Sequence, residues 1–148
     1  MKTYTVEGIA FEAPSDGVAV DSLGLNCWEV RLVGADPRAM SAWVDLVVKS
    51  REQIASIPGD PMQNLKMVYL GADRPAEKRV ERRFGAQTLA GDLHPSDLPV
   101  PSLLEIYRFD LPDGGVAGLS FARARSFDAA AAEAFHAQIA STLRAAGR

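Results

Sequence analysis

The chain has 148 residues, 47% hydrophobic and 24% charged, a composition that excludes a disordered or fibrous protein. A formal net charge of -3 argues against general nucleic-acid binding, and a single cysteine excludes an internal disulfide framework and a cysteine-rich zinc site. The length suits one domain, expected over residues 1–148. Because no long apolar stretch is present and the first residues lack a signal-peptide core, we expect a cytoplasmic protein that is not embedded in a membrane.

The first third of the chain is predicted to form strands. Apolar residues alternate over 4–6 and over 9–11, on either side of Gly8, as two short strands joined by a tight turn require. Residues 25–33 are rich in β-favouring types, which predicts another strand. Its buried face is expected to carry Trp28, Val30 and Leu32.

Residues 36–57 fit two patterns. Asp36 followed by Pro37 has the chemistry of a helix start, and the apolar residues after it follow helical spacing. We therefore predict a helix that ends before Pro58. Apolar residues also alternate over 42–48, so a strand over 43–48 is the competing interpretation.

The middle of the chain gives weaker patterns. Residues 65–70 are predicted to form a strand. The charged stretch 76–84 suits either a short helix or an exposed strand. Residues 87–101 contain several Gly and Pro breaks, so we expect mostly loop.

The last third gives the clearest pattern. Residues 103–109 and 116–124 are predicted to form a hairpin, because residues 110–115 carry strong turn chemistry. A helix is predicted over 128–146, with Ser126 or Asp128 as its cap and Gly147 as its terminator. The predicted fold class is α+β: an antiparallel sheet flanked by helices, with the long C-terminal helix packed on the sheet.

Residues that could carry catalysis are few. His94 lies among breakers and His136 lies beside the apolar stripe of the last helix, so we expect both to be exposed surface residues. Cys27 has no activating neighbour in the sequence and is expected to be structural. No nucleophile elbow or phosphate-binding loop is present. We therefore predict no catalytic residue, no cofactor and no metal, and a protein that is not an enzyme.

Cations outnumber acids between residues 74 and 83. The simplest interpretation is a solvated face of mixed charge. The functional alternative is a patch that docks an acidic partner through Arg79, Arg82 and Arg83.

The C-terminal pattern resembles a known superfamily. The run 103–109 (LLEIYRF), a glycine turn, residues 116–125 and the helical stretch FHAQIASTLR over 135–144 resemble the C-terminal half of PsbP-like (Mog-type) domains. The stretch IAFEAP over 9–14 resembles their opening strand. The resemblance implies an antiparallel sheet flanked by helices and a role that is mostly non-enzymatic.

Within that superfamily the nearest analogies are the DcrB-like bacterial proteins and the Eag-type chaperones of type VI secretion effectors. The analogy implies a bacterial chaperone or adaptor that shelters a hydrophobic segment of an effector and works as a homodimer. The predicted surface is an exposed apolar face of the sheet. Its candidate residues are Trp28, Val30, Leu32 and Tyr107. The alternative function is a small-ligand binder or enzyme with a START-like pocket between the sheet and the C-terminal helix.

Overall fold

The computed structural model describes residues 1–34, 36, 38–56, 60–71 and 74–146. The strands in this part of the chain are β1 (Lys2–Val6), β2 (Ile9–Ala13), β3 (Val18–Gly24), β4 (Cys27–Leu32), β5 (Ala42–Lys49), β6 (Lys78–Phe84), β7 (Gln87–Ser96), β8 (Ser102–Asp110), β9 (Val116–Ala124) and β10 (Arg144–Ala145). The helices are α1 (Arg51–Ser56), α2 (Pro61–Leu70) and α3 (Ala129–Thr142).

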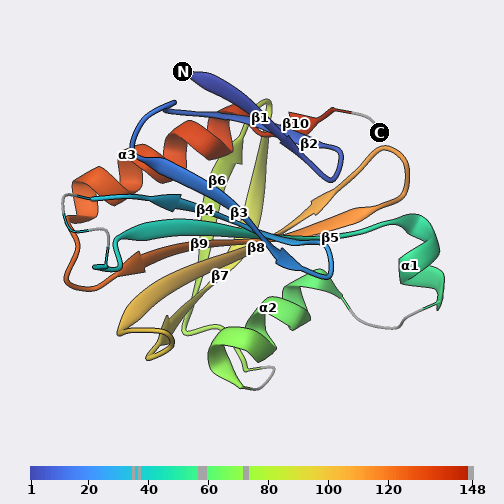
Figure 1. Cartoon of the computed structure of the whole chain (residues 1–148). Coiled ribbons are helices and arrows are strands. Elements are labelled where there is room, and N and C mark those ends of the chain that lie inside the picture. The colour runs from blue at the N-terminus through green and yellow to red at the C-terminus, as the bar shows by residue number, and fades with distance from the viewer. Residues whose placement is uncertain (35, 37, 57–59, 72–73, 147–148) are drawn as a thin grey trace.

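Seven strands form one antiparallel sheet in the order β3-β4-β5-β9-β8-β7-β6. A small second sheet has the order β1-β2-β10. Helix α3 and the small sheet lie on one face of the main sheet, and α2 lies on the other (Figure 1). The predicted α+β class with an antiparallel sheet and a C-terminal helix packed on it is confirmed, although strands dominate the fold.

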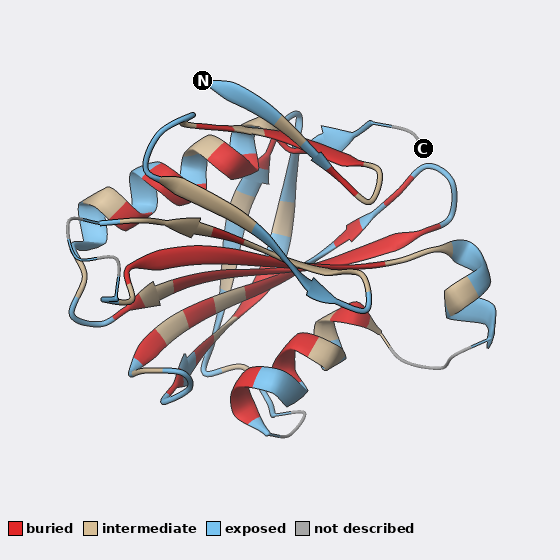
Figure 2. Ribbon diagram, viewed as in Figure 1, coloured by how far each residue is buried: buried red, intermediate tan, exposed pale blue. Residues whose placement is uncertain are grey.

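Two apolar cores hold these layers together, and β5 and β9 between them are buried along most of their length (Figure 2). The larger core lies under α3 and the small sheet and includes Phe11, Val44, Phe121, Phe135 and Ile139. The smaller core lies under α2 and includes Trp43, Leu65, Tyr69, Leu104 and Ile106. Each face of the sheet is therefore apolar at its centre.

The helix predicted after residue 36 is wrong, and the competing strand is correct. Residues 42–49 form β5, in the middle of the sheet. Asp36 accepts a hydrogen bond from the Arg38 backbone N–H at 3.0 Å, which is turn geometry. The expected helix positions of Pro37 and Pro58 lie outside the described residues.

The strand predicted over 65–70 is also wrong, because this stretch is the second half of α2. The Asp60 side chain accepts from the Met62 N–H at 2.9 Å, Pro61 occupies the first turn, and Gly71 closes the helix in the left-handed region with φ of 71°. These are the standard start and stop groups of a helix.

Residues 78–84 form an exposed strand, β6, which was one of the two alternatives. The loop predicted over 87–101 is wrong, because residues 87–96 form β7. Gly91 fits within this strand because the Tyr107 ring lies against it: a Cβ added at Gly91 would lie 2.4 Å from Tyr107 Cε1.

The predicted hairpin and last helix are confirmed as β8, β9 and α3. Asp128 is the N-cap, and its side chain accepts from the Ala130 N–H at 3.1 Å. The helix ends at Thr142, earlier than expected, because Leu143 turns into an extended conformation that leads into β10. Gly147 lies outside the described residues. None of the described helices is long and apolar enough to cross a membrane.

Candidate functional site

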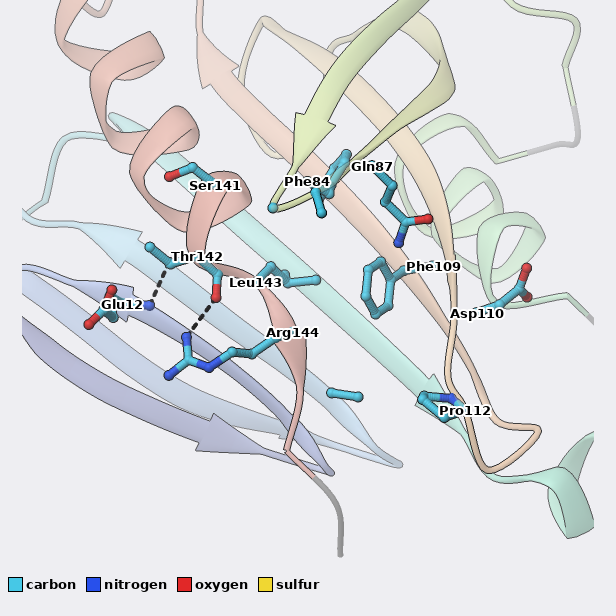
Figure 3. Close-up of a pocket in the computed structure, with 13 residues that line it drawn as sticks. Glu12, Phe84, Gln87, Phe109, Asp110, Pro112, Ser141, Thr142, Leu143 and Arg144 are labelled. Atoms are coloured by element: carbon cyan, nitrogen blue, oxygen red, sulfur yellow. Dashed lines mark hydrogen bonds between the residues drawn. The ribbon is translucent and has the colours of Figure 1, made fainter.

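A groove of about 690 Å³ opens where the two sheets meet, at the end of the main sheet (Figure 3). One wall is the β6–β7 turn at 85–87, and another is the end of β8. The third wall is the segment that leaves α3 and enters β10. Glu12 of β2 adds to the rim, so the groove is built from four regions far apart in the sequence.

The floor of the groove is apolar. It is formed by Phe84 at the end of β6, Phe109 near the end of β8 and Leu143 after α3. These side chains are 1%, 6% and 4% exposed, so they are packed in the core and present only a small part of their surface to the groove. Such a floor suits an apolar side chain of a bound partner.

Hydrogen bonds to the small sheet fix the α3–β10 wall. The Glu12 N–H donates to Thr142 Oγ1 at 2.8 Å, and Arg144 Nη1 donates to the Thr142 carbonyl at 2.7 Å (Figure 3). The Ala146 N–H donates to the Gly8 carbonyl at 2.8 Å. The rim carries both signs of charge, from Glu12, Asp110 and Arg144.

Beside the groove, a cluster of charged groups joins α3 to the sheet. Arg82 donates from Nη1 and Nη2 to the two carboxylate oxygens of Glu133 at 2.9 and 3.0 Å. Its Nη2 also lies 3.3 Å from Glu105 Oε2, and the Tyr107 hydroxyl donates to Glu105. Burial, followed by the hydrogen bond to Glu105, raises the pKa of Tyr107, so this phenol stays protonated.

His136 lies next to this cluster and is 5% exposed, so the expectation of a surface histidine is wrong. Its Nε2 lies 3.0 Å from the Ala122 carbonyl, and its ring contacts that of Phe121 edge to face. Burial, and then the nearby Arg82 charge, lowers the pKa of His136 to about 4. The imidazole is therefore neutral near pH 7 and donates to the carbonyl.

The opposite face of the sheet carries buried carboxylates. Asp92 on β7 accepts from Lys66 Nζ of α2 at 3.0 Å and also from Arg79. Asp45 on β5 is 2% exposed, and burial, followed by the charge of Glu29 on β4, raises its pKa to about 8. His94 on β7 is 2% exposed, so its predicted surface position is also wrong.

Cys27 is half-buried on the same face as Asp45, and burial raises the pKa of its thiol to about 11. The structural role expected from the sequence agrees with this, because a nucleophilic cysteine needs a lowered pKa. Among the residues that the structure describes, no three His, Cys, Asp or Glu side chains gather as a metal site would require.

The exposed apolar surface predicted from the sequence is not present at the named residues. Val30 and Tyr107 are fully buried. Trp28 and Leu32 are half-buried and pack against the larger core. The predicted inward face of β4 was correct, but α3 and the small sheet cover it. Partner binding by Trp28 and Leu32 stays a prediction.

The structure separates the three predicted arginines. They lie on β6, where successive side chains point to opposite faces. Arg79 and Arg83 are outward, with Arg79 bound to Asp92 and Arg83 Nε donating to the Gly85 carbonyl at 3.0 Å. The Arg82 side chain is 8% exposed and points to α3. They therefore form no common patch.

Sequence reasoning missed the groove. Phe109 ended a predicted strand, Leu143 lay in the predicted last helix, and Phe84 ended a stretch that suited either helix or strand. Gly85, which follows Phe84 directly and has φ of 56°, was the available sign of a tight turn there. No local pattern in the sequence indicates that this turn lies close to the end of α3.

No family model and no curated protein matches the chain. Among solved structures, a crystal structure of a protein from Bacteroides thetaiotaomicron VPI-5482 has a similar fold, with a TM-score of 0.57 and 11% sequence identity. The alignment covers 93% of this chain, which spans 45% of the length of that protein. At this identity the similarity establishes the shared fold.

Proposed function

We propose that the protein is a protein-binding module whose groove takes up an extended apolar segment of a partner protein. The observation that carries the proposal is the apolar floor of Phe84, Phe109 and Leu143, placed beside a free strand edge. A chaperone or adaptor for a bacterial secretion effector is the role that the resemblance to PsbP-like domains favours.

The free edge belongs to β10, which pairs only with β2 within the part of the chain that the structure describes. The Ala146 N–H bonds to Gly8, and hydrogen-bonded and non-bonded pairs alternate along an antiparallel ladder. The N–H and carbonyl of Ala145 therefore point away from β2, and Ala145 lines the groove. An extended segment can bond to this backbone while one of its apolar side chains reaches the floor.

The alternative, a START-like pocket between the sheet and the C-terminal helix, has less support. The space there is filled by Phe121, Phe135 and Ile139, each at most 5% exposed. A cavity of about 130 Å³ at the margin of α3 is below the usual range for a small-molecule site. A hollow of about 460 Å³ between β6 and α3 is large enough, but most of the residues that line it are charged, whereas such sites are mostly apolar.

A selection experiment tests the groove. A phage-displayed decapeptide library is panned on the immobilised protein, and selected peptides are synthesised for binding measurements by fluorescence anisotropy. We expect peptides with Leu, Ile or Phe at alternate positions. Ala86→Trp places a large ring on the exposed β6–β7 turn and should weaken their binding at least about tenfold, the loss of one anchor side chain.

The matched control is Ala134→Trp on the exposed face of α3, which should leave binding unchanged. Peptides that bind both variants as well as the natural chain would show that the groove is not the site. A panning that enriches no apolar pattern would overturn the proposed function.

We also propose that two copies of the chain associate. The feature that supports association is the edge of the main sheet at β3, which has no second partner strand among the described residues.

A further inference from the structure

The two edge strands of the main sheet differ in how strongly their side chains discourage pairing with a strand of another molecule. Five of the seven residues of β6 are charged (Lys78, Arg79, Glu81, Arg82 and Arg83), which discourages pairing with another strand. The opposite edge, β3, has the sequence VAVDSLG and carries a single charge, Asp21. Among the described residues, β3 pairs only with β4. Apart from Asp21, this edge lacks the charges and prolines that natural edge strands use against association.

The unpaired backbone groups of β3 can be identified from the ladder. The Val33 N–H donates to the Gly17 carbonyl at 2.7 Å, so this pair is a hydrogen-bonded one. Since bonded and non-bonded pairs alternate, Ala19 and Asp21 also bond to β4. The N–H and carbonyl groups of Val18, Val20 and Ser22 therefore point outward.

The regular part of this edge has defined limits. It begins after Gly17, whose φ is 75°, and it ends after Ser22, where the register with β4 shifts. Beyond it, Leu23 and Leu25 at the hairpin end are 57% and 99% exposed. Residues 18–22 thus form a short regular segment with its outward groups arranged symmetrically about Val20.

We propose that β3 pairs antiparallel with β3 of a second copy, with Val20 opposite Val20 on the two-fold axis. This inference gives residues and a register to the self-association proposed above, and it is independent of the groove. Val18 of each copy then faces Ser22 of the other, and three hydrogen-bonded pairs form. The two main sheets continue as one, with α3 of both copies on the same side.

Charge selects this register over its neighbour. With Val20 on the axis, Asp21 of each copy lies opposite Ala19 of the other. Shifting the axis to Asp21 would place two carboxylates opposite each other, which is unfavourable. Shifting it to Ala19 leaves the outward groups of Ser22 without a regular partner.

The mass in solution tests association, by sedimentation equilibrium and light scattering over a range of concentrations. The proposal predicts a dimer of about twice 15.9 kDa. Ala19→Glu should raise the dissociation constant about fivefold, because the new Glu of each copy lies opposite Asp21 of the other. Ala19→Lys should lower the dissociation constant by a similar factor, because opposite charges then face each other. Ala134→Glu and Ala134→Lys, on the exposed face of α3, are matched controls that should change nothing.

A cross-link tests the axis in a Cys27→Ser background. Paired residues of a bonded antiparallel pair lie about 5.5 Å apart, within disulfide range, so Val20→Cys should form a covalent dimer on oxidation. Val18→Cys should not, because its symmetric copies lie roughly 13 Å apart along the strands.

A monomer at all concentrations would overturn both the self-association and this interface. The β3 interface alone would be overturned by a dimer whose dissociation constant is the same in the Ala19→Glu and Ala19→Lys variants and that cross-links no better through Val20→Cys than through Val18→Cys. Either result leaves the groove proposal to its own test.

Discussion

Arg82 on β6 and Glu133 on α3, 51 residues apart in the sequence, are joined by two hydrogen bonds of 2.9 and 3.0 Å. The Arg82 side chain is 8% exposed, whereas that of Glu133 is 62% exposed. The arginine is therefore held inside the protein by an acid at its surface. The two ends of this pair should contribute unequally to stability.

Arg82→Met should lower the free energy of unfolding by about 3 kcal/mol, because it leaves Glu105 and Glu133 together without their cation. Glu133→Gln should lower it by only about 1 kcal/mol, since Arg82 keeps Glu105 and the lost charge is solvent-screened. Urea unfolding near pH 7 measures both. Equal losses in the two variants would contradict the account.

Asp45 predicts a dependence of stability on pH. Its pKa is raised to about 8 by burial and then by Glu29, whereas an unfolded aspartate has a pKa near 3.9. Between these values the folded state holds a proton that the unfolded state has lost, so this contribution is complete below about pH 4 and declines as the pH rises to about 8.

Asp45→Asn should therefore raise the free energy of unfolding at pH 8 by at least about 2 kcal/mol and change it little at pH 4. Asp21→Asn, an exposed acid on the same face of the sheet, is the control and should show no such trend. Urea unfolding between pH 4 and pH 8 measures these differences. If the stabilisation by Asp45→Asn does not grow with pH, Asp45 is not buried and protonated.

The buried His136 should make the free energy of unfolding fall as the pH is lowered, the opposite of the effect of Asp45. Its folded pKa of about 4 lies below the ordinary value of about 6.5, so the unfolded state takes up a proton first and stability falls as the pH drops through this range. Proton NMR of the imidazole should show no titration of His136 above about pH 5. The chain has only two histidines, so His94→Gln assigns the signals. A midpoint near 6.5 would place His136 in solvent.

Gly118 sets the distance between β9 and α2. A Cβ at this position would lie 2.7 Å from the carbonyl carbon and oxygen of Pro61. Gly118→Ala should displace the start of α2 and lower the free energy of unfolding by about 2 kcal/mol, as overpacking does. Gly34→Ala, with nothing within 4 Å of the added atom, should have little effect. Thermal or urea unfolding of both variants tests this difference.

The last third of the fold could be predicted from the sequence because its signals are local. The 110–115 turn and the Asp128 cap mark the ends of β8, β9 and α3 directly. Short-range periodicity could not decide β5, because a central strand covered on both faces is apolar at nearly every position and fits helical spacing as well as alternation.

The same Asp-Pro dipeptide occurs twice in the chain, and it starts a described helix at only one of the two places. Asp36 followed by Pro37 suggested a helix start, but the structure uses Asp60 and Pro61 in that way. Propensity alone could not distinguish the two dipeptides. Gly71, directly after the 65–70 run, was the local signal for a helix rather than a strand.

The candidate site could not be predicted because it depends on tertiary packing. Val30 and Tyr107 are residue types that suit a binding surface as well as a core, but α3 and the small sheet cover them. The groove floor joins Phe84, Phe109 and Leu143 from three separate elements. The buried positions of His94 and His136 likewise depend on which helix lies over each strand.

The central claim, that an extended apolar segment binds in the groove, is tested most directly by NMR titration of the ¹⁵N-labelled protein with a selected decapeptide. We predict backbone amide shifts confined to Glu12 and to residues 84–87, 109–110 and 141–145, which line the groove. Shifts that map to another surface, or no saturable shift at all, would contradict the account.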